Sequence, residues 1–341
     1  EVAAVDAPSG TLAFNVTNRG SQVTEFYLLA DDGLRIVGEV ENIDPGLTRD
    51  LVLLAQPGSY FTACKPGMVG DGIRAGFTVT DSGTPVTPTG EIGDQLAAAT
   101  TGYAAYVKDQ TAQLVTDTDA FVAAYLAGDD DQARALYAPT REHWERIEPV
   151  AESFGDLDPK LDLREADLEV GQEWTGWHRI EKDLWPPAKG YTPMTQKQRR
   201  DLADQLLADT AVLNDRVQDL EFTPDQLSNG AKELLDEVAT GKVTGEEEIW
   251  SHTDLWDFQA NLDGARVAFE GLKPVVEQKN PELATELTKR FKELQRQLDQ
   301  YRDGDGFVLY TQLTPGQVKD LAAAVDAVSE PLSRLTTTVV S

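Results

Sequence analysis

The sequence predicts a two-domain protein in which a small all-β sandwich is followed by an all-α helical bundle. Short alternating runs of apolar and polar residues fill residues 12–80, whereas beyond about residue 94 the apolar residues recur with the period of a helix. Residues 81–93 are rich in Pro, Gly, Ser and Thr, a composition typical of a linker. We therefore expect a β domain at residues 1–82, a linker at 83–93 and a helical domain at 94–341.

The β domain is expected to contain about six strands, because six runs have the alternation and the β-branched and aromatic content of strands. Turn residues separate the runs, for example Asn18-Arg19-Gly20 and Pro57-Gly58. The runs are LAFNVT (12–17), VTEFYLL (23–29), RIVGEV (35–40), TRDLVLL (48–54), SYFTAC (59–64) and AGFTVT (75–80). Together they predict a small antiparallel sandwich.

The helical domain is expected to contain about seven or eight helices, arranged as one or two four-helix bundles. Several helix starts show a capping box, in which a Thr precedes a Glu or Gln by three residues. These pairs are Thr195 with Gln198, Thr223 with Gln226, Thr244 with Glu247, and Thr314 with Gln317. Asn280-Pro281 predicts a further start, and Gly128 and Gly241 are candidate C-terminal caps.

The formal net charge of −29, from 59 acidic and 30 basic residues, argues against nucleic acid or an anionic membrane surface as a partner. Cations are the natural counterparts, although acidity can also serve solubility alone. The sequence has no apolar run long enough to span a membrane. It opens at Glu1 without a methionine, so we expect a mature chain from which a targeting segment has been removed. Cys64 is the only cysteine, which excludes an internal disulfide.

The stretch 173–185 concentrates the candidate metal chemistry. His178 and Glu181 are spaced i, i+3, so on a helix both side chains leave one face. Glu145 and Glu148 have the same spacing, and Pro149 removes the amide that would bond the carbonyl of Glu145, which should kink the helix there. Further carboxylates that could join them are Asp156, Asp158, Asp162, Glu233 and Glu237.

Helix bundles build metal sites from such pairs, and a bound cation relieves the repulsion between the carboxylates. One imidazole with several carboxylates suits iron, manganese or zinc better than copper(I). The alternative is that these carboxylates are ordinary solvated groups on helix surfaces. His143 and His252 have no carboxylate at comparable spacing in an inward-facing run, so we expect neither to be a ligand.

Four segments of the helical half resemble the imelysin-like domain classed as peptidase M75. The family's His-x-x-Glu motif falls on His178 and Glu181, within G-W-H-R-I-E-K-D-L-W at 176–185. The other segments are R-E-H-W-E-R-I-E-P-V-A-E-S-F-G-D-L-D-P at 141–159, S-H-T-D-L-W-D-F-Q-A-N-L-D-G-A at 251–265 and F-V-L-Y-T-Q-L-T-P at 307–315. In the β half, V-E-N-I-D-P-G at 40–46 and L-A-Q-P-G-S-Y-F-T-A-C at 54–64 are similar to a cupredoxin-like domain. The combination resembles EfeO-type iron-uptake components.

The resemblance implies an N-terminal cupredoxin-like Greek-key sandwich followed by an imelysin-like α-helical bundle. It implies an extracytoplasmic, monomeric protein, with a lipid anchor at the removed N-terminus as one option. The protein would capture iron as Fe³⁺ or Fe²⁺, with zinc or copper as alternative metals. Delivery would be to an EfeU-like membrane iron permease, with an EfeB-like haem Dyp-type peroxidase as a second partner. The metal ligands implied in the helical domain are Glu145, Glu148, Asp162, His178, Glu181 and Glu237. Those implied in the cupredoxin-like domain are Glu25, Glu39, Glu41 and Cys64.

Two other functions can be weighed against iron capture. A zinc metallopeptidase of the His-Glu-x-x-His kind needs two histidines at i, i+4, and His178 has no such partner. A carbohydrate-binding protein could stack sugars on the six tryptophans, but most of these lie in runs with helical apolar periodicity. A blue copper site needs two histidines and a cysteine, and the β domain, which holds Cys64 and Met68, has no histidine.

Overall fold

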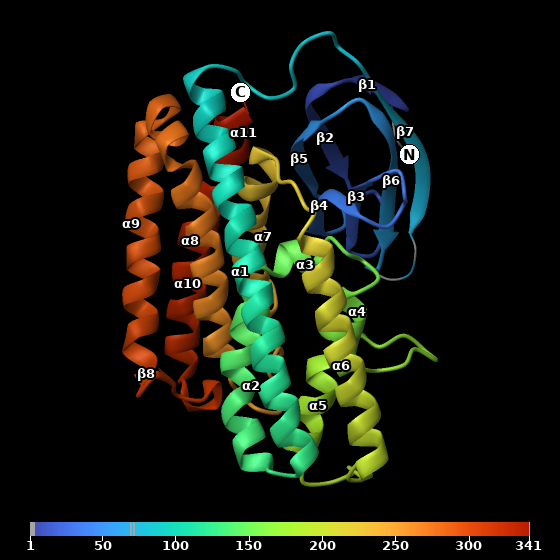
Figure 1. Cartoon of the computed structure of the whole chain (residues 1–341). Helices are drawn as coiled ribbons and strands as arrows, with labels where there is room; N and C mark the ends of the chain where they lie inside the picture. Colours follow the sequence, from blue (N-terminus) through green and yellow to red (C-terminus); the bar gives the residue numbers. More distant parts are fainter. Residues whose placement is uncertain (1–3, 69, 71, 341) are drawn as a thin grey trace.

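The computed structural model describes residues 4–68, 70 and 72–340, and in it a β-sandwich packs beside a larger helical domain (Figure 1). The strands of the sandwich lie between Asp6 and Thr80, and the long helices run from Glu91 to Val340. The predicted fold class, an all-β domain followed by an all-α domain, is therefore confirmed. The first helix begins at Glu91, so residues 91–93 of the predicted linker are helical.

The sandwich consists of a five-stranded and a two-stranded sheet, in the orders β1-β7-β6-β3-β4 and β2-β5. The six predicted runs all form strands, and only the three-residue β1 was not predicted. Alternate residues fill the space between the sheets, where Leu28, Ile43 and Leu53 are fully buried. The strands are β1 (Asp6–Pro8), β2 (Gly10–Thr17), β3 (Thr24–Leu29), β4 (Ile36–Ile43), β5 (Thr48–Ala55), β6 (Gly58–Pro66) and β7 (Ile73–Thr80).

Eight helices of nine or more residues form the bulk of the helical domain in the described part of the chain. These are α1 (Glu91–Ala127), α2 (Asp130–Glu145), α5 (Gly176–Leu184), α6 (Gln196–Val217), α7 (Pro224–Thr240), α8 (Asp254–Lys279), α9 (Pro281–Leu298) and α10 (Pro315–Leu332). The short helices are α3 (Glu148–Glu152), α4 (Asp158–Leu161) and α11 (Leu335–Val340), with a 3₁₀ helix η2 (Lys242–Thr244). No helix among these residues is both long and apolar enough to cross a membrane.

The helix ends test the predicted caps. Capping boxes are present at Thr195, Thr223 and Thr314, and the side chain of Asn280 caps α9. The box predicted at Thr244 is wrong, because Thr244 ends η2 and the next residue, a glycine, takes the left-handed conformation that stops a helix. The chain from 246 to 251 is a turn instead, and this turn contributes to the site described below.

The two domains are joined by direct contacts as well as by the linker. Strands β4 and β5 face α7 and α11 (Figure 1). The amide of Leu54 donates to Asp225 Oδ2 at 2.8 Å, and Asn229 donates to the carbonyl of Val52 at 3.1 Å. A cavity of about 400 Å³ remains between the sandwich and α7, and we call it the interdomain cavity. Its walls include the acidic side chains of Glu39, Glu41, Glu233, Asp236 and Glu237.

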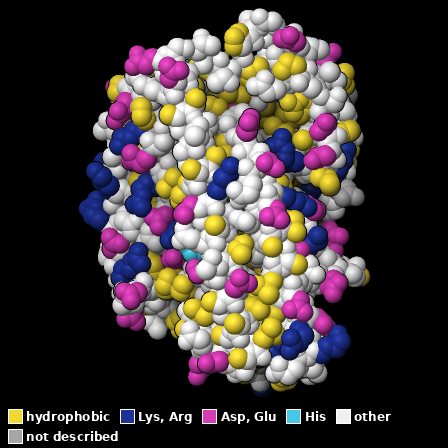
Figure 2. Space-filling model, in the orientation of Figure 1, with side chains coloured by type: hydrophobic (Ala, Val, Ile, Leu, Met, Phe, Trp, Pro, Cys, Tyr) yellow, Lys and Arg dark blue, Asp and Glu magenta, His cyan; other side chains and the backbone are white. Residues whose placement is uncertain are grey.

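The surface charge is dispersed on the face seen in Figure 2, where acidic side chains are spread among lysines and arginines over both domains. Dispersed negative charge of this kind supports solubility but defines no binding site.

Candidate metal centre

A cluster of buried charged side chains lies where α2, α3, α5 and the end of α4 meet the turn 246–251. We call it the charged cluster. It contains five of the six helical-domain ligands expected from the sequence, all but Glu237. Its members are Arg141, Glu145, Glu148, Asp162, His178, Glu181, Lys242, Glu247 and Glu248.

The break between α2 and α3 places two of the carboxylates. Glu145 is the last residue of α2 and Glu148 the first of α3, with Pro149 in its first turn. Because Pro149 has no amide hydrogen, the carbonyl of Glu145 needs another donor, and the side chain of Asn261 on α8 supplies it at 2.8 Å. The predicted interruption at Pro149 is confirmed, and it turns both carboxylates toward α8.

A glycine at the start of α5 brings the histidine close to α4. Gly176 has φ of 81°, and a Cβ there would lie 2.1 Å from the carbonyl oxygen of Leu161. Only glycine combines this conformation with so close an approach. Since Asp162 caps the end of α4 and His178 lies in the first turn of α5, the contact sets these two side chains next to each other.

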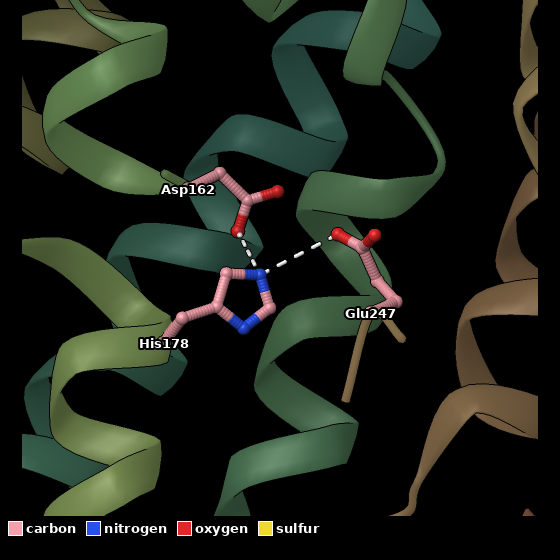
Figure 3. Close-up of side chains that lie close together, drawn as sticks. All are labelled: Asp162, His178 and Glu247. Carbon is pink, nitrogen blue, oxygen red and sulfur yellow. Dashed lines mark ion pairs between the residues drawn. The ribbon is translucent and has the colours of Figure 1, made fainter. Parts of the chain in front are cut away.

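His178 faces two carboxylates from separate parts of the chain (Figure 3). Its Nε2 lies 3.4 Å from Asp162 Oδ1 and 3.4 Å from Glu247 Oε1, and the three side chains could hold a metal ion together. This nitrogen is buried and has no hydrogen-bond partner, while the side chain as a whole is 2% exposed. A buried nitrogen that makes no hydrogen bond and faces two carboxylate oxygens is suited to binding a metal ion in place of its proton.

The other ring nitrogen is held in place by Glu181. His178 Nδ1 lies 3.2 Å from Glu181 Oε2, and Glu181 Oε1 accepts the amide hydrogens of Trp250 and Ser251 at 2.9 and 2.7 Å. In metal sites a carboxylate in this position orients the imidazole and leaves the opposite nitrogen to the metal. Glu181 is thus placed to orient His178 in the triad of Asp162, His178 and Glu247. Its carboxylate also belongs to a second group, with His178 and Glu248, that could hold a metal ion.

Two buried cations balance the rest of the cluster. The guanidinium of Arg141 contacts Asp162 and Glu145 through its terminal nitrogens and Glu248 through Nε at 2.6 Å. The ammonium of Lys242 contacts Glu145 at 2.7 Å. The six carboxylates thus outnumber the side chains of Arg141, Lys242 and Arg164 that contact them. Burial and neighbouring carboxylates raise the pKa of Glu148 and of Glu248 well above the usual value, so a further cation would be favoured in the cluster.

The charges shift one another's protonation. The pKa of His178 is raised well above its usual value: burial and the charge of Arg141 oppose the shift, but contacts with Glu181, Glu247 and Asp162 outweigh them. Burial would raise the pKa of Asp162, yet Arg141 and His178 hold it below its usual range. The pKa of Glu247 is lowered as well, because its contact with His178 outweighs burial. These contacts thus favour a protonated imidazole between two ionised carboxylates.

Three groups of described residues place their ligand atoms within 4.8 Å of one another. They are Asp162, His178 and Glu247; His178, Glu181 and Glu248; and Glu145, Glu148 and Asp162. Glu237 belongs to none of them. Its carboxylate lies 3.4 Å from the ammonium of Lys242 and lines the interdomain cavity.

The candidates of the β domain are divided between the two faces of a sheet. In the β3–β6 pairing Cys64 is opposite Phe26 and packs toward the sandwich core, whereas Glu25 is opposite Lys65 and forms an ion pair with it at 3.3 Å. Successive residues of a strand point to opposite faces, so the structure does not bring Cys64 and Glu25 together. Burial raises the pKa of the Cys64 thiol.

Glu39 and Glu41 lie on the face of β4 that is turned to the helical domain. Both line the interdomain cavity together with Glu233 and Glu237. Burial and the neighbouring carboxylates raise the pKa of Glu39 and of Glu41 well above the usual value. The structure thus groups these two residues with Glu237 rather than with Cys64.

The other two histidines lie outside the groups that could hold a metal among the described residues. His143 Nδ1 is 2.9 Å from Gln110 Oε1, and its Nε2 is 3.2 Å from Asp117 Oδ2. His252 takes a left-handed backbone conformation after the turn. Asp156, an early candidate carboxylate, pairs instead with Arg216 at 2.6 Å.

Four members of the cluster were not predicted as part of a site. Arg141 could have been found, since it precedes Glu145 by four residues on one helix. Glu247 was assigned to a cap, and Glu248 follows it in a turn without periodicity. Lys242 gave no local signal, because its partner Glu145 lies 97 residues away in the chain.

Comparison with known proteins agrees with this architecture. The imelysin family, also named peptidase M75, matches residues 99–335. The "Iron uptake system component EfeO" of Escherichia coli O157:H7 is 39% identical over 330 residues, which cover 96% of this chain and 85% of that protein. Proteins of the same name from Escherichia coli strain K12 and Shigella flexneri show the same identity and coverage. The resemblance expected from the sequence is confirmed, and the chain belongs to the imelysin family.

Proposed function

We propose that this protein is an iron-binding component of an uptake system and that it captures iron at Asp162, His178 and Glu247. The observation that carries the proposal is the buried Nε2 of His178, which has no hydrogen-bond partner and faces two carboxylate oxygens at 3.4 Å. The name of the related EfeO proteins supports iron as the cargo. One imidazole with carboxylates suits Fe²⁺ and Fe³⁺, and zinc is a competitor for the same donors, as copper is to a lesser degree.

Glu145 and Glu148 extend the proposed site beyond the triad. They form the third group together with Asp162, so an ion bound by Asp162 has further oxygens within reach. Glu181 acts by orienting the histidine, and Glu237 lies at the side of the cluster that faces the interdomain cavity. In the β domain, Glu39 and Glu41 remain candidates for a weaker second site, and Glu25 lies close enough to raise the pKa of both. Cys64 remains a separate candidate on the other face of the sheet.

We expect delivery of the iron to take place within an iron uptake system like the one named for the related EfeO proteins. The partners would be an EfeU-like membrane permease, which receives the iron, and an EfeB-like haem peroxidase. We place the protein outside the cytoplasm and expect it to act as a monomer. Neither nucleic acid nor an anionic surface suits a chain of net charge −29.

The two alternative functions have less support. A metallopeptidase would need a second histidine at the metal, and His143 lies instead with Gln110 and Asp117. Sugar stacking would need exposed aromatic faces. None of the six tryptophans is exposed, and Trp144 and Trp177 are fully buried.

Exchanging Glu247 for glutamine tests the proposed ligand set. We expect Glu247→Gln to weaken Fe²⁺ binding by roughly 10–100-fold, the range found when a metal site loses one orienting or ligating carboxylate. The measurement is a titration of chelator-treated protein by calorimetry under argon. Glu246→Gln is the matched control, since Glu246 is the exposed neighbour in the same turn. Equal affinities for the two variants would remove Glu247 from the site.

The raised pKa of His178 predicts that iron affinity increases with pH. Iron must displace the proton from Nε2, so binding should release about one proton near neutral pH. Calorimetric titrations in buffers of different ionisation enthalpy measure this number, and it should fall toward zero in His178→Ala. The stability of the metal-free protein changes with pH in the opposite sense. The protonated ring of His178 stabilises the fold fully at a pH below its unfolded-state pKa of about 6.5, and this stabilisation is lost as the pH rises through the raised pKa of the folded state. An affinity independent of pH would contradict the proposed role of His178.

A further inference from the structure

Lys242 occupies a position that a metal cation could take. Its side chain is 3% exposed, and its ammonium lies 2.7 Å from Glu145, 2.5 Å from Glu148 and 3.1 Å from Asn261 Oδ1. An ammonium has three hydrogens to donate, and these three oxygens accept them. Glu145 and Glu148 also belong to a group that could hold a metal ion, so the lysine supplies positive charge where such an ion would supply it.

A second carboxylate position is available to the same ammonium. Glu237 lies 3.4 Å from it, is 25% exposed in its side chain and lines the interdomain cavity of about 400 Å³. Lys242 begins the 3₁₀ helix η2, which is separated by a single residue from the end of α7, the helix that carries Glu237. Rotation of the flexible lysine side chain can therefore exchange Glu145 and Glu148 for Glu237 while keeping an ion pair.

Arg141 offers no such exchange. Its guanidinium contacts Glu145, Asp162 and Glu248 at once, and the side chain is fully buried. A planar guanidinium held at three positions is a fixed part of the cluster, whereas an ammonium on a four-carbon stem can move. The two cations thus differ in whether they can make room for a metal ion.

We propose that Lys242 is a tethered cation that occupies Glu145 and Glu148 in metal-free protein and moves to Glu237 when iron binds. The inference rests on the proposed function and adds a reason why binding is reversible. Part of the binding free energy of iron is used to separate the lysine from the two carboxylates, so Lys242 lowers the apparent affinity and favours release. It also keeps two buried carboxylates apart and ordered before iron arrives.

Lys242→Met tests this role, since methionine keeps an unbranched side chain and removes the charge. We expect Fe²⁺ to bind roughly tenfold more tightly, within the range usual for two coupled equilibria, because the competing cation is gone. The same variant should unfold at a lower temperature without metal, because Glu145 and Glu148 lose their partner. A lysine with a structural role alone would weaken both properties, so the opposite changes identify a competitor.

The control is Lys232→Met. Lys232 pairs with Asp236 on the same helix as Glu237 and lines the interdomain cavity. Among the ion pairs of the described residues, Lys242 contacts Glu145 and Glu148, whereas Lys232 does not. We expect its affinity for Fe²⁺ to equal that of the unaltered protein. An affinity of Lys242→Met that is unchanged or weaker, with Lys232→Met unaffected, would overturn the proposal.

A measurement on the unaltered protein covers the case in which Lys242→Met does not fold. Acetylation of Lys242 by an amine-reactive ester, followed by peptide mass spectrometry, should be faster in iron-saturated than in metal-free protein, because the ammonium moves toward the cavity. An equal or slower rate would overturn the displacement. If His178→Ala bound iron as well as the unaltered protein, the proposed iron site itself would fail. If only the Lys242 experiments failed, the iron site would stand without a displaceable lysine.

Discussion

Replacing His178 with alanine is expected to weaken iron binding by about 100-fold or more, the largest effect on affinity of any single substitution in the site. Loss of an orienting residue costs about 10–100-fold, so loss of the ligand that it orients should reach or exceed the upper end. His178 also supplies the one nitrogen donor within the three groups that could hold a metal among the described residues. Titration with Fe²⁺ under argon, followed by metal analysis after gel filtration, gives the affinity and the bound stoichiometry.

His143→Ala is the control for that result. His143 is a histidine of α2 in the same domain, buried to a similar extent, and it contacts Gln110 and Asp117 rather than the charged cluster. Its substitution should leave iron affinity unchanged, and Glu181→Gln should fall between the two variants, because the ring loses an acceptor but keeps both nitrogens. Undiminished binding by His178→Ala would show that the triad is not where iron binds.

The sequence could predict the fold because local and long-range signals agree there. Turn residues and alternation specify the strands, while Thr195, Thr223 and Thr314 start helices with side chains that satisfy their own first amides. Pro149 was informative for the same reason, because a missing amide has a local consequence whatever surrounds it. The resulting break is what turns Glu145 and Glu148 inward.

The site was only partly predictable because half of it depends on distant contacts. His178 and Glu181 lie one turn apart, so their shared face follows from helix geometry. Their different roles do not, since Glu181 is held by the amides of Trp250 and Ser251, 69 and 70 residues away. Once those amides occupy one oxygen, the carboxylate is left to orient the ring.

Glu247 shows that the sequence pattern of a capping box can occur where no helix begins. A Thr followed three residues later by a Glu is the pattern of a capping box, and Thr244 with Glu247 fits it. The glycine after Thr244 takes a left-handed conformation, however, and the chain turns toward α5 instead of starting a helix. The carboxylate then lies 3.4 Å from His178 and 3.3 Å from Arg164, so tertiary contacts decide its place.

In the β domain, too, long-range contacts decide which candidate residues lie together. Cys64 and Glu25 are separated in the sequence, and only the strand pairing decides whether they meet. Because Cys64 is opposite Phe26, the two side chains leave opposite faces of the sheet. The interdomain cavity was likewise not predictable, since Glu39 and Glu237 belong to domains whose packing has no local signal.

Replacing Arg141 with methionine is expected to lower the free energy of unfolding by about 3–5 kcal/mol, the largest effect on stability that we predict. The guanidinium is fully buried and contacts Glu145, Asp162 and Glu248, so its loss leaves three carboxylates facing one another. Urea unfolding of chelator-treated protein at pH 7 measures the change. Arg290→Met is the control: the pair of Arg290 with Glu293 on α9 is partly exposed and should contribute less than about 1 kcal/mol.

The pH and iron dependence of the Arg141→Met defect separate lost charge from lost packing. Asp162 has a lowered pKa in the fold, so the stabilisation that it draws from Arg141 is present above its unfolded-state value and is lost as the pH falls through the folded value. The difference from the unaltered protein should therefore be largest near neutral pH and shrink in acid. Iron should also restore part of the lost stability, because a bound cation again offsets the carboxylates. A defect that stayed the same in acid and with iron would mean that Arg141 acts through packing, and the charged cluster would then have no shortage of positive charge for iron to relieve.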